Sequence, residues 1–337
     1  MNMISTRSHR ERTPVIDGLN CAVLTRDQFE RTLEGRVAAL NLTSMRPAND
    51  LAASMEDVAK ALAVVAANAD LVSVVASVAE IRQVTAQGKL GIILGTQNST
   101  FLEHDLSLLR VMQRLGVRIM QPTYMEQNEL GSGVLAKQPG GLTAKGHEWV
   151  ALMNETRMLV DLSHVGYQTA MDAAKASKRP VICSHSNARA LCDSLRNIPD
   201  DQIRAVARTG GTVGVTLWPP MLRHATRPTL DDFFDQVDHM VKLVGIDHVA
   251  FGSDCSEQTK TEEQWQASFG PRGIYPEVTG ILGDWFIFTQ RFTEGYESLA
   301  HTGRLIDGLG ARGFSEADVD KIMGGNLLRV YEDVWGE

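Results

Sequence analysis

The stretch LVDLSHVGYQTAMDAAKASKRPVICSH, at residues 159–185, holds two apolar runs separated by a segment of helical periodicity. Residues 159–162 and 181–184 are typical of buried strands, and residues 168–177 are typical of a helix. A helix that joins two successive strands makes them parallel and covers a face of their sheet, which explains why both runs are apolar throughout. The stretch therefore predicts one unit of a parallel α/β fold.

The same strand–helix unit recurs along the chain. Apolar runs predict strands at residues 15–20, 38–42, 90–95, 117–123, 159–162, 181–184, 212–217 and 248–252. Helical periodicity lies between them, at residues 55–81, 104–115, 144–158, 168–177, 200–208 and 230–244. Eight such units predict an α/β fold of the (β/α)8 TIM barrel type. The alternative is a doubly wound open sheet, which a GxGxxG or GxxxxGK[ST] loop after an early strand would favour, and no such loop stands there.

Composition limits the class of protein. The 337 residues carry a formal net charge of −8, which argues against nucleic acid or an anionic membrane surface as partner, because either needs a basic face. No long apolar run could span a membrane, and the polar, basic start of the chain is not a secretory signal, so we expect a cytoplasmic protein. The cysteines are too few for a disulfide framework and form no CxxC pair: Cys21, Cys183, Cys192 and Cys255.

We expect a single barrel domain over residues 1–337, although the length would also allow two domains. Strand–helix units occupy residues 14–254, a long loop or lid occupies 255–300, and C-terminal helices occupy 301–337. Ser315 should cap one of these helices, and the GGN at 324–326 should break it. Aromatic residues of the lid could close a pocket, or form a second hydrophobic layer or a subunit contact: Trp265, Tyr275, Trp285 and Phe286.

Polar residues stand at the carboxyl ends of three predicted strands. Two of these ends carry a histidine, His164 and His185, and the last carries Asp254. The loops after the strands form the reactive face of a parallel barrel, so these side chains should converge. Neutral imidazoles suit a zinc-like ion, and a carboxylate beside them can ligate the ion or accept a proton from water. Alternatively, each histidine is an ordinary core or loop residue, as we expect for the other histidines of the chain.

Two further residues point to a substrate site. Arg196 follows the sixth strand, where its guanidinium could hold a carboxylate in a bidentate pair, or else form a salt bridge with Asp200 or Asp201. Tyr124 follows the fourth strand and could donate a hydrogen bond to a developing oxyanion, or else pack as an ordinary aromatic. Both are candidates for substrate binding, and Tyr124 also for catalysis.

Five blocks in fixed order resemble the membrane (renal) dipeptidase family, the zinc-dependent peptidases of family M19. They are DLSHVG at 161–166, SHSNARAL at 184–191, LRNIPDD at 195–201, HVAFGSD at 248–254 and IMGGNLLRVY at 322–331. The chain resembles the bacterial cytosolic branch, with QPTYMEQNELGSG at 121–133 where the animal enzymes have a histidine-bearing segment. The resemblance implies an amidohydrolase-type barrel, dipeptide hydrolysis and a homodimer.

The resemblance also implies a role for each matching position. Family members bind two zinc ions bridged by a glutamate; His164 and His185 match the histidines on one ion, and Asp254 matches the aspartate at the other. Arg196 matches the arginine that holds the substrate carboxylate. Tyr124 stands where the mammalian enzymes place a histidine that stabilises the tetrahedral intermediate.

The chain departs from the family pattern at three ligand positions. Leu19 and Cys21 replace the histidine and the aspartate after the first strand, and Gln97 replaces the bridging glutamate after the third. A Cys21 thiolate or the Gln97 carbonyl could still ligate an ion, but Leu19 cannot. Two dications at ~4 Å repel by roughly 16 kcal/mol at an effective dielectric constant of ~20, so they need anionic ligands between them. We therefore expect one zinc ion rather than two.

The predicted function is metal-dependent hydrolysis of a dipeptide or related small amide with a free carboxylate. The ion would be held by His164, His185 and Asp254, with Cys21 and Gln97 as further candidate ligands. Asp254 would take a proton from an activated water and pass it to the leaving amine. The alternative is a family member that binds a small carboxylate ligand without hydrolysing it, and the changed ligand positions leave this alternative open.

Overall fold

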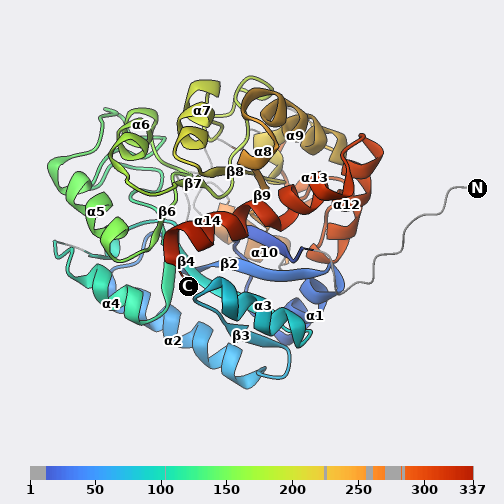
Figure 1. Cartoon of the computed structure of the whole chain (residues 1–337), viewed down its shortest axis with the longest axis horizontal. Coiled ribbons are helices and arrows are strands. Elements are labelled where there is room, and N and C mark those ends of the chain that lie inside the picture. Colours follow the sequence, from blue (N-terminus) through green and yellow to red (C-terminus); the bar gives the residue numbers. More distant parts are fainter. Residues whose placement is uncertain are drawn as a thin grey trace, which may run out of the picture.

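A closed ring of parallel strands forms the centre of the molecule (Figure 1). The computed structural model describes residues 13–102, 104–223, 226–255, 261–269, 282 and 285–336. Parallel bridges from Asp161 to Ile182 and from Asn20 to Cys255 join the two sheets into one ring, which confirms the predicted TIM barrel. In order around the ring, the strands are β1 (Val15–Asn20), β2 (Val37–Met45), β4 (Leu90–Thr96), β5 (Val117–Met120), β6 (Leu159–Val160), β7 (Ile182–Cys183), β8 (Thr212–Val215) and β9 (Val249–Phe251).

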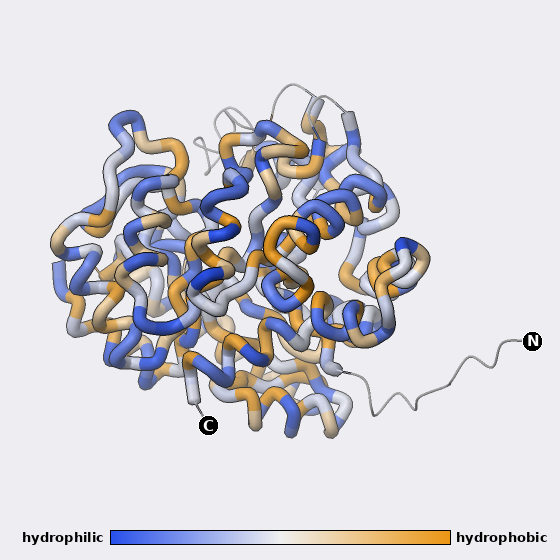
Figure 2. The backbone as a smooth tube through the Cα atoms, turned by 45° about the horizontal axis from the view of Figure 1, so that its top comes forward, coloured by the Kyte–Doolittle hydropathy of each residue, from blue (hydrophilic) through white to orange (hydrophobic). Residues whose placement is uncertain are grey.

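Helices cover the outside of the ring, with apolar and polar residues recurring along them (Figure 2). Side chains of Thr25, Asp50, Ser77 and Thr143 accept hydrogen bonds from the first turns of the helices that follow them, so these helices begin where the sequence supplies a cap. The covering helices are α1 (Arg26–Glu34), α2 (Leu51–Ala67), α3 (Val78–Ala86), α4 (Leu108–Arg114), α5 (Ala144–Glu155), α6 (Tyr167–Ala176), α7 (Asp200–Arg208), α8 (Pro219–Leu222) and α9 (Leu230–Val244).

The last helix closes the amino-terminal end of the barrel. In Figure 1, α14 (Asn326–Trp335) lies across the ring, and its Leu327, Val330, Tyr331 and Val334 are buried. They belong to one hydrophobic cluster with a residue from each of seven strands: Ile16, Ala39, Ile93, Ile119, Leu159, Ile182 and Ala250. Because α14 fills the end where the strands begin, the carboxyl ends of the strands lie at the other end of the barrel.

The predicted helix at residues 55–81 is wrong. α2 ends at Ala67, and the short strand β3 (Val72–Val74) and α3 follow within the same stretch. β3 pairs with the first residues of β4 and stays outside the ring, because β5 takes the same edge of β4 further along. Asn68 caps the end of α2, and its side-chain amide donates to the carbonyl of Val64. The Ala- and Val-rich composition continues beyond this residue, so periodicity alone did not show where the helix ends.

The C-terminal elements largely follow the prediction. Ser315 caps α13 (Glu316–Asp320) in a capping box, and the backbone departs from helical angles at Gly324 before α14. A GxGxxG sequence does occur at residues 308–313, at the end of α12 (Thr302–Ala311), where it follows no strand and therefore forms no phosphate loop.

The loop predicted at residues 255–300 contains α10 (Glu262–Phe269), and Tyr275 lies outside the described residues. In the described part of the chain, no helix has the length and apolar character that a membrane crossing needs.

Candidate active site

A cavity of about 460 Å³ opens at the carboxyl ends of the strands. It brings together Cys21 and Asp254, which are 233 residues apart in the sequence. His185 does not line the cavity and is fully buried against His164. The other residues predicted for the site all line it: Cys21, Gln97, Tyr124, His164, Arg196 and Asp254.

His164 and His185 follow the neighbouring strands β6 and β7, and their rings meet. The two Nε2 atoms lie 2.8 Å apart, which is a hydrogen-bond distance. Burial holds the pKa of both imidazoles well below its usual value, and the nearby Arg196 cation acts in the same direction. Both rings are therefore neutral near pH 7, and one Nε2 donates while the other accepts.

A chain of hydrogen bonds behind His185 decides which nitrogen donates. The Ser184 hydroxyl donates its hydrogen to Asp161 at 2.6 Å. The Ser184 oxygen also lies 2.7 Å from the His185 Nδ1, and because its own hydrogen is already used, the oxygen accepts the hydrogen of Nδ1. His185 then carries its proton on Nδ1 and a lone pair on Nε2. His164 donates from Nε2, and its buried Nδ1 has no hydrogen-bond partner among the described residues. The Gln121 amide, 2.7 Å from Asp161, holds that carboxylate in place.

Cys21, Gln97 and Asp254 form a second cluster, at the ends of β1, β4 and β9. The Cys21 thiol donates to the Asp254 carboxylate over 3.6 Å. The Gln97 amide nitrogen donates to the Cys21 sulfur at 3.2 Å and to the Thr43 hydroxyl at 2.9 Å. Burial, followed by the charge of Asp254, raises the pKa of the Cys21 thiol, so it is neutral. The adjacent Leu19 is buried and offers no donor atom.

The carboxyl group of Asp254 has an unusual acidity. Burial raises its pKa to about 7, although the Arg196 cation works against this rise, and Asp17 adds a small increase. A carboxyl group that titrates near neutral pH is suited to accept and return a proton. Burial likewise raises the pKa of Asp17 to about 6, against hydrogen bonds from Ser253 and Asn20.

Arg196 is a buried cation that faces the cavity with only 2% of its surface exposed. Between described residues, its guanidinium makes one hydrogen bond, 3.4 Å long, to a backbone carbonyl. It does not pair with the aspartates that follow it, because Asp200 bonds to His239 and Asp201 accepts the hydroxyl of Tyr167. Its remaining donors are available to a bound anion.

Tyr124 lies between the histidines and an aromatic wall. Its ring stacks on His164 with centroids 4.2 Å apart. It also packs against a hydrophobic cluster that contains Trp265 and Phe286, and Trp285, the third described aromatic of the predicted lid, packs against the same cluster. These aromatics therefore form a hydrophobic layer beside the cavity, and Phe269 of α10 lines the cavity itself.

The backbone is also unusual at the site. Among described non-glycine residues, four have a positive φ, and two of them are His164, at 65°, and Asp254, at 50°. This left-handed region is sparsely populated by residues with a side chain, and it occurs where the surrounding structure holds the backbone in place. Both residues lie in loops that follow short strands, and both side chains line the cavity.

The two imidazoles can serve one metal ion only after a proton shift. His185 already has a lone pair on Nε2, with Nδ1 held by Ser184 as metal-binding imidazoles usually are, whereas His164 carries its proton on Nε2 and would have to move it to the buried Nδ1 before ligating. A second ion would meet Leu19, the donating amide of Gln97 and the protonated thiol of Cys21. The described residues contain no group of three or more His, Cys, Asp and Glu side chains that could hold an ion.

Sequence reasoning missed the residues that support the histidines. Asp161 and Ser184 stand within the quoted strand ends, yet only the fold shows that the Ser184 hydroxyl connects the Asp161 carboxylate to His185. Their position beside a candidate ligand was the available signal. Thr43 and Asp17 gave no signal, because a lone Thr or Asp at a strand end is common.

Comparisons with known proteins match the sequence and the fold of this chain. The family model described as membrane dipeptidase (peptidase family M19) matches residues 8–267. The dipeptidase aclJ of Aspergillus oryzae is 31% identical over 251 residues, which are 73% of this chain but only 52% of that protein. A protein from the pqqA 5′ region of Klebsiella pneumoniae is 32% identical over 67% of this chain and 76% of its own length. The crystal structure of an amidohydrolase from Pseudomonas aeruginosa superposes with a TM-score of 0.86 at 32% identity, over 96% of this chain and 97% of that one.

Proposed function

This chain belongs to the membrane dipeptidase family, peptidase family M19, and we propose that it hydrolyses a small amide beside a free carboxylate, such as a dipeptide or a related compound. Membership of a family of hydrolases favours catalysis over simple binding of a carboxylate. The fungal dipeptidases that it resembles are about twice as long as the aligned region, so the substrate is inferred from the site of this chain.

The buried guanidinium of Arg196 carries this proposal. A cation taken out of water loses its solvation, and the loss is recovered only if an anion pairs with it. Asp200 and Asp201 are engaged elsewhere, and Asp254 acts on Arg196 through its charge without a hydrogen bond between the two among those described, so the guanidinium keeps donors for a substrate carboxylate. A bidentate pair at this position would also fix the orientation of the substrate relative to the histidines.

His164 and His185 would hold a single zinc ion, as the donor atoms described above allow. When bound, the ion would polarise the substrate carbonyl and make a neighbouring water more acidic. The neutral state of both imidazoles favours this binding, because protonated imidazoles cannot ligate. Asp161 and Ser184 would keep the His185 ring in the required orientation.

Asp254 and Tyr124 would carry out the remaining steps. Asp254 accepts a proton from the attacking water, and it then delivers that proton to the amine that leaves. Its pKa of about 7 suits both directions of transfer. Tyr124, stacked on His164, donates its phenolic hydrogen to the oxygen that becomes negative in the tetrahedral intermediate.

The test combines elemental analysis with assays of dipeptide hydrolysis. We expect about one zinc ion per chain after growth with added zinc, and activity that falls at least ~10²-fold in Asp254→Asn. Arg196→Met should raise KM more than it lowers kcat, because the carboxylate contact is made in the ground state as well as in the transition state. A metal content near zero, or unchanged activity in Asp254→Asn, would refute the mechanism, and two ions per chain would refute the single-ion site.

A further inference from the structure

We propose that the cavity selects an N-acyl amino acid, with a free carboxylate on one side of the amide and a neutral, apolar acyl group on the other. A dipeptide differs from such a compound by a positively charged ammonium next to the scissile carbonyl. The inference rests on the proposed amide hydrolysis and concerns which amide is cleaved.

The side of the cavity formed by β1, β2 and β4 is uncharged. Its polar side chains are the thiol of Cys21, the hydroxyls of Thr43 and Ser44, and the amide of Gln97. The Gln97 nitrogen donates to Cys21 and Thr43, and the Ser44 hydroxyl donates to the carbonyl of Gly95. An ammonium has three donor hydrogens and needs acceptors, preferably anionic ones. The hydrogens of these side chains point at neighbouring groups of the protein, and none of the side chains carries a negative charge that an ammonium could pair with.

The acidic residues of the cavity are already engaged. Two of the described residues that line it are acidic, Asp57 and Asp254. Both oxygens of Asp57 accept from Arg46, at 2.9 Å and 3.1 Å, and one also accepts from Asn49 at 2.7 Å. Asp254 carries the proton during the reaction, so an ammonium bound to it would interfere with catalysis. Neither carboxylate is therefore left to bind an ammonium.

An apolar wall lies beside the uncharged cluster. It consists of Leu42 of β2, Val23 and Leu24 after β1, and Ala61 and Val64 of α2, and the charged Arg46, Asp57 and Lys60 line the same cavity. Val23 is 59% exposed. An acyl chain that lay along this wall would remove that surface from water and gain binding energy with each methylene.

The reaction on such a substrate needs no further reactant. The water oxygen bonds to the acyl carbon while Asp254 takes one of its protons, and the carbon–nitrogen bond then breaks as the amine receives that proton. The products are a fatty or short-chain carboxylic acid and a free amino acid. The amino acid retains the carboxylate that pairs with Arg196 throughout.

The test compares two substrates that differ only in the ammonium. One is leucyl-alanine, and the other is 4-methylpentanoyl-alanine, which has the same carbon skeleton without the amino group; both alanine enantiomers are assayed with the zinc-loaded enzyme. We expect kcat/KM to be at least tenfold higher for the acyl compound. Lengthening a straight acyl chain should raise kcat/KM by roughly twofold to fourfold for each methylene until the wall is filled.

Two variants link this preference to the residues named. Gln97→Glu adds a negative charge at nearly constant size, and we expect it to shift the ratio of the two kcat/KM values toward the dipeptide by about tenfold. Val64→Glu should weaken the chain-length effect. Val111→Glu is the matched control, because Val111 is an exposed valine on α4 that does not line the cavity, and it should leave both ratios unchanged.

The possible results separate this inference from the proposed function. Faster cleavage of leucyl-alanine would overturn the inference and leave the hydrolase intact. If neither compound is cleaved, the proposed function fails, and calorimetric binding of the two compounds to Asp254→Asn then decides the inference. Tighter binding of the acyl compound would support it, and equal or tighter binding of the dipeptide would overturn it.

Discussion

Ser184 decides, through its hydroxyl, which ring nitrogen of His185 carries the proton. Its hydroxyl hydrogen goes to Asp161, and its oxygen receives the Nδ1–H of His185. The neighbouring His164 has a buried Nδ1 with no partner among the described residues, so its tautomer depends on His185 across the 2.8 Å contact. The state of both rings is thus set by one serine and one aspartate that do not touch the substrate.

We predict that Ser184→Ala lowers metal affinity and kcat by about 10- to 100-fold, with KM changing less, because the His185 ring loses the bond that aims its Nε2. Nitrogen NMR of the metal-free protein should show a mixed His185 tautomer in place of a single one. Ser184→Thr keeps the hydroxyl and should therefore retain most of the metal affinity and most of kcat.

Ser163→Ala is the control for that variant. The Ser163 oxygen accepts the backbone N–H of His185 at 3.1 Å and lies 3.4 Å from the Ser184 oxygen, but it makes no hydrogen bond to the His185 ring among the described contacts. Ser163→Ala should therefore lower the free energy of unfolding while leaving the tautomer of His185 unchanged. An unaltered His185 spectrum in Ser184→Ala would contradict the assignment.

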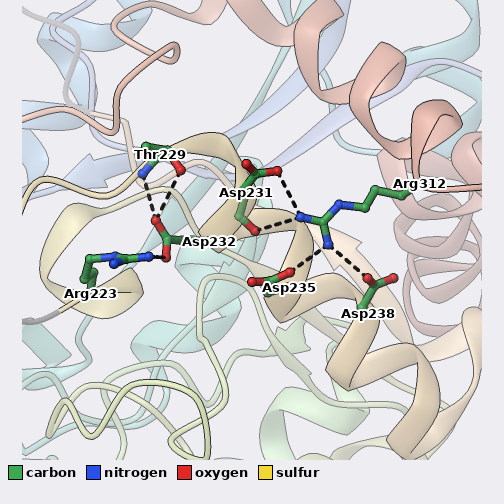
Figure 3. A network of polar contacts seen from close by, with 7 residues as sticks. All are labelled: Arg223, Thr229, Asp231, Asp232, Asp235, Asp238 and Arg312. Atoms are coloured by element: carbon green, nitrogen blue, oxygen red, sulfur yellow. Dashed lines mark hydrogen bonds and ion pairs between the residues drawn. The ribbon is translucent and has the colours of Figure 1, made fainter.

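At the scale of elements, α12 and α9 are joined by charge as well as by packing. Figure 3 shows Arg312, at the end of α12, between three aspartates on one face of α9. Its guanidinium nitrogens lie 3.0 Å from Asp231, 2.7 Å from Asp235 and 3.2 Å from Asp238. These aspartates raise the pKa of Arg312 above its usual value, with Asp235 contributing most. One arginine thus offsets the mutual repulsion of a row of carboxylates spaced by about one helical turn.

We predict that Arg312→Ala lowers the free energy of unfolding by about 1 kcal/mol in 0.1 M salt, because the carboxylates lose their shared partner while solvent screens each pair. The loss should shrink in 1 M salt. Urea denaturation measures both values. Arg208→Ala removes a charge from an exposed position on α7 and should change stability much less. A loss that does not depend on salt would mean that packing, rather than charge, joins the two helices.

The elements themselves were largely predictable from the sequence. The strand at residues 15–20 and the helices at residues 200–208 and 230–244 have the bounds that periodicity predicted. β3 was missed because three residues are too few to show an alternation, and they lie within an Ala- and Val-rich stretch that also fits a helix. Strands of two residues, such as β7, were found because the apolar run around them is longer than their hydrogen-bonded part.

At the scale of the whole molecule, Asp17 helps to close the barrel. It accepts the backbone N–H of Ser253 at 2.7 Å and the Ser253 hydroxyl at 2.6 Å, and so joins β1 to the end of β9. Burial raises its pKa to about 6. In the unfolded chain the same carboxyl titrates near its ordinary value of about 3.9.

We predict that this shift makes stability depend on pH. The folded protein binds the proton more tightly, so the contribution of Asp17 is complete below about pH 4 and is lost as the pH rises through 6, by about 2–3 kcal/mol in all. The free energy of unfolding of the natural protein should fall relative to that of Asp17→Asn between pH 4 and pH 7. A difference that stays constant with pH would show that the pKa is not raised.

The sequence by itself determined the barrel, the family and the group of residues at its mouth. Apolar runs, helical periodicity and the placement of His164, His185 and Asp254 after strands depend on local order, so they can be read along the chain. The tertiary structure alone decided how those residues act. Burial sets the acidity of Asp254, the Ser184 bond sets the proton of His185, and the Arg196 cation is left facing the cavity. These properties depend on distance and solvation, which exist only once strands from opposite ends of the chain have closed into a ring.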